Sequence, residues 1–348
     1  MPKITIAKRE IGPDAPPYII AEISANHNGN IDRALQLIEE AQKTGADAVK
    51  LQTFRPDTIT IDSQRPEFTI HGGEWDGRQL YDLYQEAHTP WEWHEALFEK
   101  GRALGITVFS SPFDHTAVDF LETLNCPAYK IASPELIDLP LIAKVATTGK
   151  PMIISTGMGS DEEIVEAVAT ARDNGATEIV VLHCISGYPT PVAASNLGNI
   201  THLRTLLDTD IGLSDHTRGT TVSAAAVALG ATVIEKHFTL SHDDGGLDAA
   251  FSLDAKEFTE LVTNAKEIFH SIKNLSDSGE TAQKDTRNFR RSLYVTQDIR
   301  AGEPFTAENI RSVRPAAGLP PKHYWSVLDA KAACNIKAGE PLDWDMVK

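Results

Sequence analysis

From residue 18 to about residue 269, the chain repeats one pattern of apolar and polar positions. A short β-rich run is followed by a polar turn and then by a stretch with helical spacing of apolar residues. The eight β-rich runs cover residues 18–24, 48–53, 106–113, 128–133, 152–157, 179–186, 210–216 and 233–238. Most are apolar on both faces, as expected for parallel strands that are covered by helices. The count and size match a (β/α)8 TIM barrel. An open doubly wound sheet is the alternative, but no GxGxxG segment follows the first run.

The stretches between these runs carry helix signals. Residues 31–44 form an apolar stripe and are followed by Gly45, the residue type favoured just after a helix. Residues 161–174 follow Ser160, which begins a capping-box sequence. Residues 254–272 form the last helix of the pattern.

The connection between the second and third runs is longer than one helix requires. Its segment 68–101 ends in a helical pattern that predicts the barrel helix. The first part of the segment predicts an inserted lobe at the mouth of the barrel, and long insertions of this kind are usually functional. Trp75 in this lobe is expected either to line a substrate site or to cap the barrel core.

The pattern of apolar and polar residues changes near residue 275, where a polar stretch begins. We expect a catalytic barrel over 1–274, a polar linker over 275–289 and a small β-rich domain over 290–348. The phrase DIRAGEPFTAENI is answered by NIKAGEPLDWDMV, which indicates a short internal repeat in the last domain. A domain of this size is near the lower limit for independent folding, so we expect it to pack against another part of the protein.

Charge and composition exclude several classes of protein. The formal net charge of −17 disfavours nucleic acid and anionic membrane surfaces as partners, and it requires any anionic substrate to be held by locally gathered cations. Cys126, Cys184 and Cys334 are far apart, which indicates a reducing compartment rather than a disulfide framework. We find no signal-peptide pattern and no membrane-spanning stretch, and we therefore expect a cytoplasmic protein.

Polar residues gather at the ends of the predicted strands, where barrel chemistry takes place. Lys50 shares a strand face with Gln52, and Lys130 either points inward or faces outward. A lysine within a buried strand is costly unless it is paired. We therefore interpret Lys50 and Lys130 as anion ligands, surrounded by Ser and Thr hydroxyls that would complete a phosphate or carboxylate cradle. Polar residues at the last two strand ends are Ser214, Asp215, His216, Glu235, Lys236 and His237.

Two histidines end adjacent strands. His216 and His237 could both reach one metal ion, because neighbouring strands lie about 4.8 Å apart. Imidazole with oxygen ligands suits a divalent metal such as Mn, Zn, Fe or Co. His183 lies deeper in its strand and is interpreted as structural. Asp248 lies in a loop after the last strand, where it is either a simple polar residue or a carboxylate near the barrel mouth.

Taken together, these segments resemble the sialic acid synthase family, whose members condense phosphoenolpyruvate with an amino sugar. The resemblance covers essentially the whole chain. It rests on IAEISANHNG, KLQT, SSPF, YKIAS, STGM, HC–YPTP, GLSDHT, EKHF and a C-terminal RSLYV–DI–GE–RP pattern that resembles the antifreeze-like SAF domain.

Within the family, QTFRPDT and FTIHGGEWDGRQLYDLY resemble the branch that makes pseudaminic acid. Sialic acid synthases proper typically carry a different insert here, and often have Asn where this chain has Ser186. The resemblance implies 2,4-diacetamido-2,4,6-trideoxy-L-altropyranose as the sugar. Synthesis of N-acetylneuraminate or legionaminate by the same mechanism is the alternative.

The resemblance also implies roles for individual residues. The catalytic residues would be Glu22, Lys50, Lys130 and His216. The metal would be held by His216 and His237. The substrate-binding residues would be Gln52, Ser111, Ser133, Glu135, Ser155, Ser186, Tyr188, Ser214, Asp248 and Arg314.

The implied cofactor is a divalent metal, with Mn²⁺ first and Mg²⁺ or Co²⁺ as alternatives, and no organic cofactor. The implied assembly is a homodimer with swapped SAF domains, in which Arg314 reaches the sugar in the partner's barrel. Two hypotheses of other classes remain. One is an aldolase that uses Lys50 or Lys130 as a Schiff base, and the other is a carbohydrate-binding SAF module on an inactive barrel.

Overall fold

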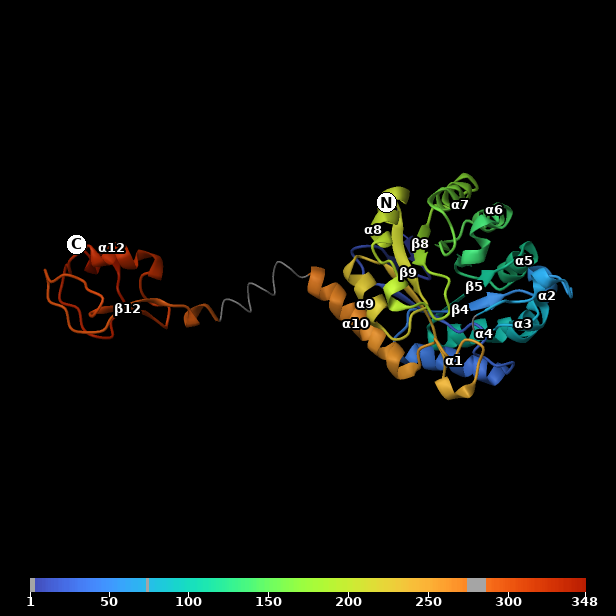
Figure 1. Cartoon of the computed structure of the whole chain (residues 1–348), viewed down its shortest axis with the longest axis horizontal. Helices are drawn as coiled ribbons and strands as arrows, with labels where there is room; N and C mark the ends of the chain where they lie inside the picture. The colour runs from blue at the N-terminus through green and yellow to red at the C-terminus, as the bar shows by residue number, and fades with distance from the viewer. Residues whose placement is uncertain (1–3, 73–74, 274–285) are drawn as a thin grey trace. The chain divides into compact units, whose positions relative to one another are not determined.

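The computed structural model describes residues 4–72, 75–273 and 286–348. The chain divides into two compact units, Met1–Ile272 and Lys273–Lys348 (Figure 1). Within the expected linker 275–289, residues 275–285 lie outside the described residues. The expected boundaries of the two domains and the linker therefore remain predictions.

The first unit is a closed barrel of eight parallel strands, which confirms the predicted TIM barrel and excludes the open sheet. The strands follow one another around the barrel in chain order, and β10 closes the circle by pairing with β3. Their bounds are β3 Tyr18–Glu22, β4 Ala48–Thr53, β5 Thr107–Pro112, β6 Tyr129–Ile131, β7 Met152–Ser155, β8 Ile179–Cys184, β9 Asp210–Asp215 and β10 Val233–His237.

Helices surround the strands in Figure 1 and bury their apolar stripes against them. The three helices named from the sequence are present, including the reciprocal capping box between Ser160 and Glu163 and the positive φ of Gly45. The barrel helices are α1 Ile31–Lys43, α4 Trp91–Leu104, α5 His115–Thr123, α6 Leu139–Ala146, α7 Asp161–Asp173, α8 Asn199–Leu207, α9 Thr221–Ala228 and α10 Ala255–Lys273. None of the described helices is long and apolar enough to cross a membrane.

The insertion after β4 contains two helices, α2 Pro56–Ile59 and α3 Leu80–Ala87. Its aromatic side chains pack onto the barrel rim, where the ring of Phe54 meets those of Tyr84 and Phe113 edge-on. Trp75 contacts Tyr188, with 6.0 Å between ring centroids. The insertion therefore reaches the loops at the carboxyl ends of the strands.

An N-terminal hairpin, β1 Ile4–Ile6 and β2 Arg9–Ile11, was not predicted. Three-residue strands are too short to show a period, and the turn residues Ala7 and Lys8 take positive φ angles that are usually reserved for Asn and Gly. The hairpin buries Ile4, Ile6 and Ile11 in the barrel core. Ile4 lines a small cavity together with the first residues of β8 and β9, so the hairpin covers the amino end of the barrel.

The C-terminal unit contains β11 Ser292–Val295, β12 Ile310–Val313 and α12 Tyr324–Leu328. The two copies of its sequence repeat pair with each other, because Ile299 and Ile336 exchange two backbone hydrogen bonds of 2.9 and 2.8 Å. Its apolar core comprises Leu293, Val295, Ile299, Phe305, Ile310, Leu319, Val327, Ala332, Ile336 and Leu342.

Short 3-10 helices connect the larger elements. They are Pro66–Phe68, Ser133–Ile137, Val192–Ala194, His242–Asp244, Arg287–Phe289, Pro321–His323 and Trp344–Met346.

Candidate active site

A buried ionic cluster lies inside the barrel toward the carboxyl ends of the strands. Lys50 Nζ lies 2.8 Å from Glu22 Oε2 and 3.4 Å from Glu235 Oε1. Lys130 Nζ lies 3.3 Å from the same oxygen of Glu235. Ser214 Oγ donates a hydrogen bond to this oxygen at 3.1 Å. The structure thus brings Glu22, Lys50, Lys130 and Ser214 together around Glu235.

The pKa values of the two lysines in this cluster are shifted in opposite directions. Burial by itself lowers the pKa of Lys50, but Glu22 and Glu235 outweigh burial, so this pKa lies above its usual value. Burial lowers the pKa of Lys130 below its usual value, because Glu235 only partly compensates for it. The charged form of Lys130 is therefore not fully stabilised by the protein, and a bound anion would stabilise it further.

Two serine hydroxyl groups lie at or just after the carboxyl ends of β7 and β8. Ser155 Oγ and Ser186 Oγ are buried and have no hydrogen-bond partner among the described residues. Gly157 N donates to Ser133 Oγ at 3.0 Å. A Cβ on Gly157 would lie 2.7 Å from Ser133 Oγ and would clash with Ser186 Oγ, so these groups converge on one place. Ser111 completes the set by accepting from Lys50 Nζ at 3.3 Å. Buried hydroxyls that lack a partner need one, and a bound anion would accept hydrogen bonds from them.

Beyond the ionic cluster, a hydrogen-bonded chain leads to the loop after β10. Gln52 Nε2 donates to Glu22 Oε1 at 3.1 Å and to Ser24 Oγ at 3.0 Å. Ser24 in turn donates to Asp248 Oδ2. Asp248 is buried, and burial raises the pKa of its carboxyl group. The chain places Gln52 and Asp248 on opposite sides of Ser24.

The two histidines face each other at the ends of β9 and β10, with ring centroids 5.5 Å apart. His216 Nδ1 lies 3.0 Å from the carbonyl oxygen of Ile185, a geometry that assigns the proton to Nδ1 and leaves Nε2 available. His237 Nδ1 is buried, has no hydrogen-bond partner within the described ranges, and lies 3.7 Å from Asp248 Oδ2. Two imidazoles with free nitrogens beside a carboxylate are a donor set that fits a divalent metal.

Two aromatic side chains, Tyr188 and Phe251, pack against the histidines and form an aromatic wall. The ring centroid of Tyr188 lies 4.3 Å from that of His216 and 5.4 Å from that of Phe251. Phe251 also packs edge-on against His237, at 5.0 Å. With Trp75 on the far side of Tyr188, the wall gives the site an apolar flank.

Two predicted site residues stand apart from these contacts. Burial raises the pKa of Glu135 to about 7, and its Oε2 has no partner among the described residues. Lys130 and Lys50 act on its charge through space. Arg314 follows β12 in the C-terminal unit, where its side chain is exposed, whereas every other predicted site residue belongs to the barrel unit.

The sequence analysis missed Glu235 and Ser24 as site residues. Glu235 shares a strand face with His237, and this alternation was the available signal. Of the polar residues named at the ends of the last two strands, Asp215 and Lys236 face away from the barrel interior. They form a 2.9 Å ion pair, and Asp215 also binds Ser223 of α9, outside the barrel. His183 likewise faces outward, with Nε2 2.7 Å from the carbonyl oxygen of Ser195.

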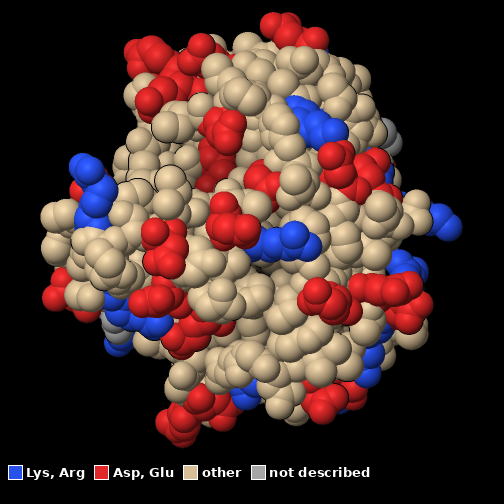
Figure 2. All heavy atoms as spheres, turned by 90° about the vertical axis from the view of Figure 1, so that its right-hand side faces the viewer, with Lys and Arg blue, Asp and Glu red and all other residues tan. Residues whose placement is uncertain are grey.

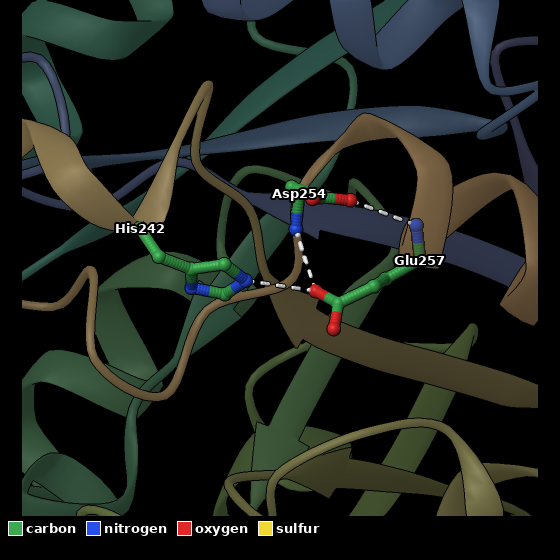
Figure 3. Close-up of side chains that lie close together, drawn as sticks. All are labelled: His242, Asp254 and Glu257. Carbon is green, nitrogen blue, oxygen red and sulfur yellow. Dashed lines mark hydrogen bonds and ion pairs between the residues drawn. The ribbon is translucent and has the colours of Figure 1, made fainter.

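A second cluster of possible metal ligands lies at the start of α10 (Figure 3). Asp254 and Glu257 form a reciprocal capping pair, at 3.0 and 2.9 Å. His242 places one ring nitrogen 3.0 Å from Glu257 Oε2 and the other 3.2 Å from the carbonyl oxygen of Ala249. Because both nitrogens face acceptors, this imidazole is arranged as a donor to both. We therefore interpret the cluster as a helix cap.

The charged surface differs from the interior of the site. Figure 2 shows acidic side chains spread over the drawn face with basic ones between them, in line with the net charge of −17. Lys50 and Lys130 are only 4% and 2% exposed. Two cations that could hold an anion thus lie inside the barrel, and the acidic side chains of the drawn face would repel a polyanion.

Comparisons with known proteins agree with this arrangement. The chain is 43% identical to the pseudaminic acid synthase of Campylobacter jejuni over 94% of this chain and 96% of that protein. It is 37% identical to the N,N'-diacetyllegionaminic acid synthase of the same species over 92% and 97% of the two chains. The crystal structure of spore coat polysaccharide biosynthesis protein SpsE from Bacillus subtilis superimposes with a TM-score of 0.69 at 33% identity, covering 100% and 99% of the two chains.

The family matches divide the chain in the same order as the fold. Residues 290–348 match the SAF domain, and residues 37–277 match the NeuB family. The barrel with its C-terminal SAF domain thus belongs to the NeuB family.

Proposed function

We propose that this protein is a pseudaminic acid synthase. It would condense phosphoenolpyruvate with 2,4-diacetamido-2,4,6-trideoxy-L-altropyranose and water, and release phosphate. Carbon 3 of phosphoenolpyruvate bonds to carbon 1 of the open-chain sugar, water supplies a hydroxyl to carbon 2, and the bond from carbon 2 to the phosphate oxygen breaks. The observation that carries the proposal is the buried lysine pair with partnerless serine hydroxyls, set beside two facing histidines.

The lysines and serines hold the phosphate and carboxylate of phosphoenolpyruvate. Lys130 supplies the positive charge that Glu235 leaves partly uncompensated. Ser155 and Ser186 supply hydroxyl donors that have no partner in the part of the chain that the structure describes. Charge-assisted hydrogen bonds in a buried site are strong enough to hold a small, highly charged substrate. The complete set in this role is Lys50, Lys130, Ser111, Ser133, Ser155, Ser186 and Ser214.

His216 and His237 would hold the divalent metal, which we propose to be Mn²⁺, with Mg²⁺ or Co²⁺ as alternatives. When bound, such a metal supplies Lewis-acid polarisation of the sugar aldehyde. The carbonyl of Ile185 fixes the His216 ring, and Asp248 lies 3.7 Å from the His237 ring. The short distance between Asp248 and His237 supports a role for the Asp248 carboxylate in binding a sugar hydroxyl.

Glu22 is the group that orients and deprotonates the attacking water. Burial raises the pKa of Glu22, despite its contact with Lys50. A carboxyl group with a raised pKa exchanges a proton more readily near neutral pH. Gln52 donates to the other oxygen of Glu22 and thereby keeps the carboxyl group in one orientation.

Tyr188, Phe251 and Trp75 line the sugar end of the site. The deoxy carbon and the two acetamido methyl groups of the proposed sugar are apolar, and an aromatic wall buries them favourably. N-acetylmannosamine carries a hydroxyl where the proposed sugar has the deoxy carbon. The contact between Trp75 and Tyr188 supports this assignment, because it joins the insertion to the wall.

The SAF domain is proposed to swap between the two subunits of a homodimer. Arg314 would then reach the sugar in the partner's barrel, which would explain why so exposed an arginine belongs to the site. We propose that the catalytic barrel spans residues 1–274 and the SAF domain residues 290–348, with a linker between them. The free cysteines fit a reducing compartment, and we propose a cytoplasmic location.

Phosphate release tests the reaction. Metal-depleted and Mn²⁺-reloaded enzyme would be given phosphoenolpyruvate with each of three sugars: the 2,4-diacetamido L-altro sugar, the corresponding legionaminate precursor and N-acetylmannosamine. Metal-dependent release with only the first sugar supports the proposal. Preference for another sugar moves the assignment to the legionaminate or neuraminate branch. No release with any sugar contradicts the synthase reaction, and trapping with pyruvate and borohydride would then test the Schiff-base aldolase.

Complementation tests the swap. The variants Lys130→Met and Arg314→Ala are each expected to be inactive. After equal amounts are mixed and their subunits exchanged, a mixture of swapped dimers should regain roughly a quarter of the wild-type activity, because about half of the dimers are mixed and one of the two sites in each is intact. Each variant re-equilibrated alone is the control. Exchange without recovery contradicts the swapped arrangement.

A further inference from the structure

A second buried ion pair joins β9 and β10 from the outer side of the barrel. Asp215 and Lys236 are paired directly in the strand register. Side chains alternate between strand faces, so these two point away from the interior into which Ser214 and Glu235 point. Lys236 Nζ lies 2.9 Å from Asp215 Oδ2, and the two side chains are 0% and 1% exposed. Side-chain contacts therefore join β9 and β10 on both faces, between Ser214 and Glu235 inside and between Asp215 and Lys236 outside.

The contacts of this pair converge on the peptide units next to His216. The backbone N–H of Thr217 donates to Asp215 Oδ1 at 2.8 Å. Lys236 Nζ donates to the carbonyl oxygen of Thr217 at 2.5 Å. Ser223 Oγ donates to Asp215 Oδ2 at 2.6 Å and connects the pair to α9. The turn that follows His216 is thus held at both its N–H and its C=O by side chains outside the site.

We infer that Asp215 and Lys236 are positioning residues for the metal-binding histidines. Asp215 immediately precedes His216, and Lys236 immediately precedes His237. Each member of the ion pair is joined by one peptide bond to a histidine, and the two imidazole rings lie 5.5 Å apart, so the pair is placed to fix their separation. The inference rests on the proposed function, because it takes these two histidines as the metal ligands.

Fold stability alone does not account for such a pair. Desolvation of two charges offsets much of their attraction, and well-packed apolar side chains often serve a fold equally well. Groups that orient metal-binding histidines, in contrast, commonly change metal affinity 10- to 100-fold when they are removed. The direction of the contacts, toward one turn beside one histidine, favours the positioning role.

The test measures Mn²⁺ binding to the metal-free full-length enzyme without substrate, by titration followed by electron paramagnetic resonance. The variants are Lys236→Met, Asp215→Asn and the double variant Asp215→Leu with Lys236→Met, in which neither charge is left unpaired. The matched control is Thr232→Val, at the opposite end of the β9–β10 pair, where the buried hydroxyl donates to the carbonyl oxygen of Ile211. Thermal unfolding of each protein is recorded alongside.

We expect the Mn²⁺ dissociation constant to rise at least about 10-fold in the pair variants that remain folded. It should stay within about twofold of wild type in Thr232→Val, since that change is remote from the histidines. Unchanged Mn²⁺ affinity in the folded double variant would overturn the positioning role while leaving the metal proposal intact. An equal loss in the control would also overturn it. A wild-type enzyme that binds no divalent metal would overturn both.

Discussion

The two ends of the barrel use the same eight strands in opposite ways. At the amino end, the hairpin packs Ile4, Ile6 and Ile11 into a continuous apolar core. At the carboxyl end, Lys50 and Lys130 are buried among hydroxyls and carboxylates. Apolar burial contributes stability without chemistry, whereas buried charge creates reactivity at a cost in stability. We therefore expect changes at the amino end to alter unfolding and changes at the carboxyl end to alter turnover.

The largest expected effect is on turnover. Lys130→Met should lower phosphate release at least about 100-fold, because it removes a buried charge-assisted contact to the substrate anion. Glu235 keeps its contact with Lys50 but loses the charge of Lys130, so turnover is compared under conditions in which the variant is shown to be folded. Lys150→Met is the matched control, because Lys150 pairs with Glu122 at 2.7 Å just before β7 begins. Equal losses of activity in the two variants would contradict the division between the barrel ends.

The next effect lies at the amino end. Ile6→Ala should lower the free energy of unfolding of the barrel by about 3 kcal/mol, because it opens a cavity under a fully buried side chain. Denaturant titration measures this loss. The values of kcat and KM at a temperature where the variant is folded should remain those of wild type. A loss of kcat without a loss of stability would show that the hairpin influences the site.

The third prediction concerns the stability of the protein as a function of pH, which Glu135 should influence. Burial raises its pKa from 4.5 to about 7, so the folded protein binds this proton more tightly than the unfolded chain does. Stability contributed by this group is present at low pH and is lost as pH rises through 7. Glu135→Gln should therefore be more stable than wild type at pH 8, by up to about 2 kcal/mol, and equal to it at pH 4. Denaturant titrations at both pH values measure the difference, and a pH-independent gain would contradict the raised pKa.

The smallest effect concerns the anion cradle. Gly157→Ala should raise the KM for phosphoenolpyruvate about 10-fold, because the added methyl group displaces Ser133 or Ser186. Gly198→Ala is the control, as nothing lies within 4 Å of the position that its added methyl group would take. Steady-state kinetics with varied phosphoenolpyruvate measures both. A KM for Gly157→Ala equal to that of the control would show that the cradle lies elsewhere.

Much of the fold could be predicted from local patterns. The eight apolar runs became the eight strands, and the capping sequence at Ser160 became an observed capping box. The hairpin over 4–11 could not be predicted, because its strands are too short to show a period and Ala7 and Lys8 carry no turn signal. Its position is decided by the burial of three isoleucines against the barrel.

The sequence by itself determined which residue types stand at the strand ends, and period-two alternation grouped those that share a face. It could not say which face is the interior, because strands of this barrel are buried on both sides. Only barrel closure decided that Glu235 joins Lys50 and Lys130, whereas its neighbour Lys236 pairs with Asp215 on the outside. Residues far apart in the chain acquire a common electrostatic environment only when the strands that carry them meet.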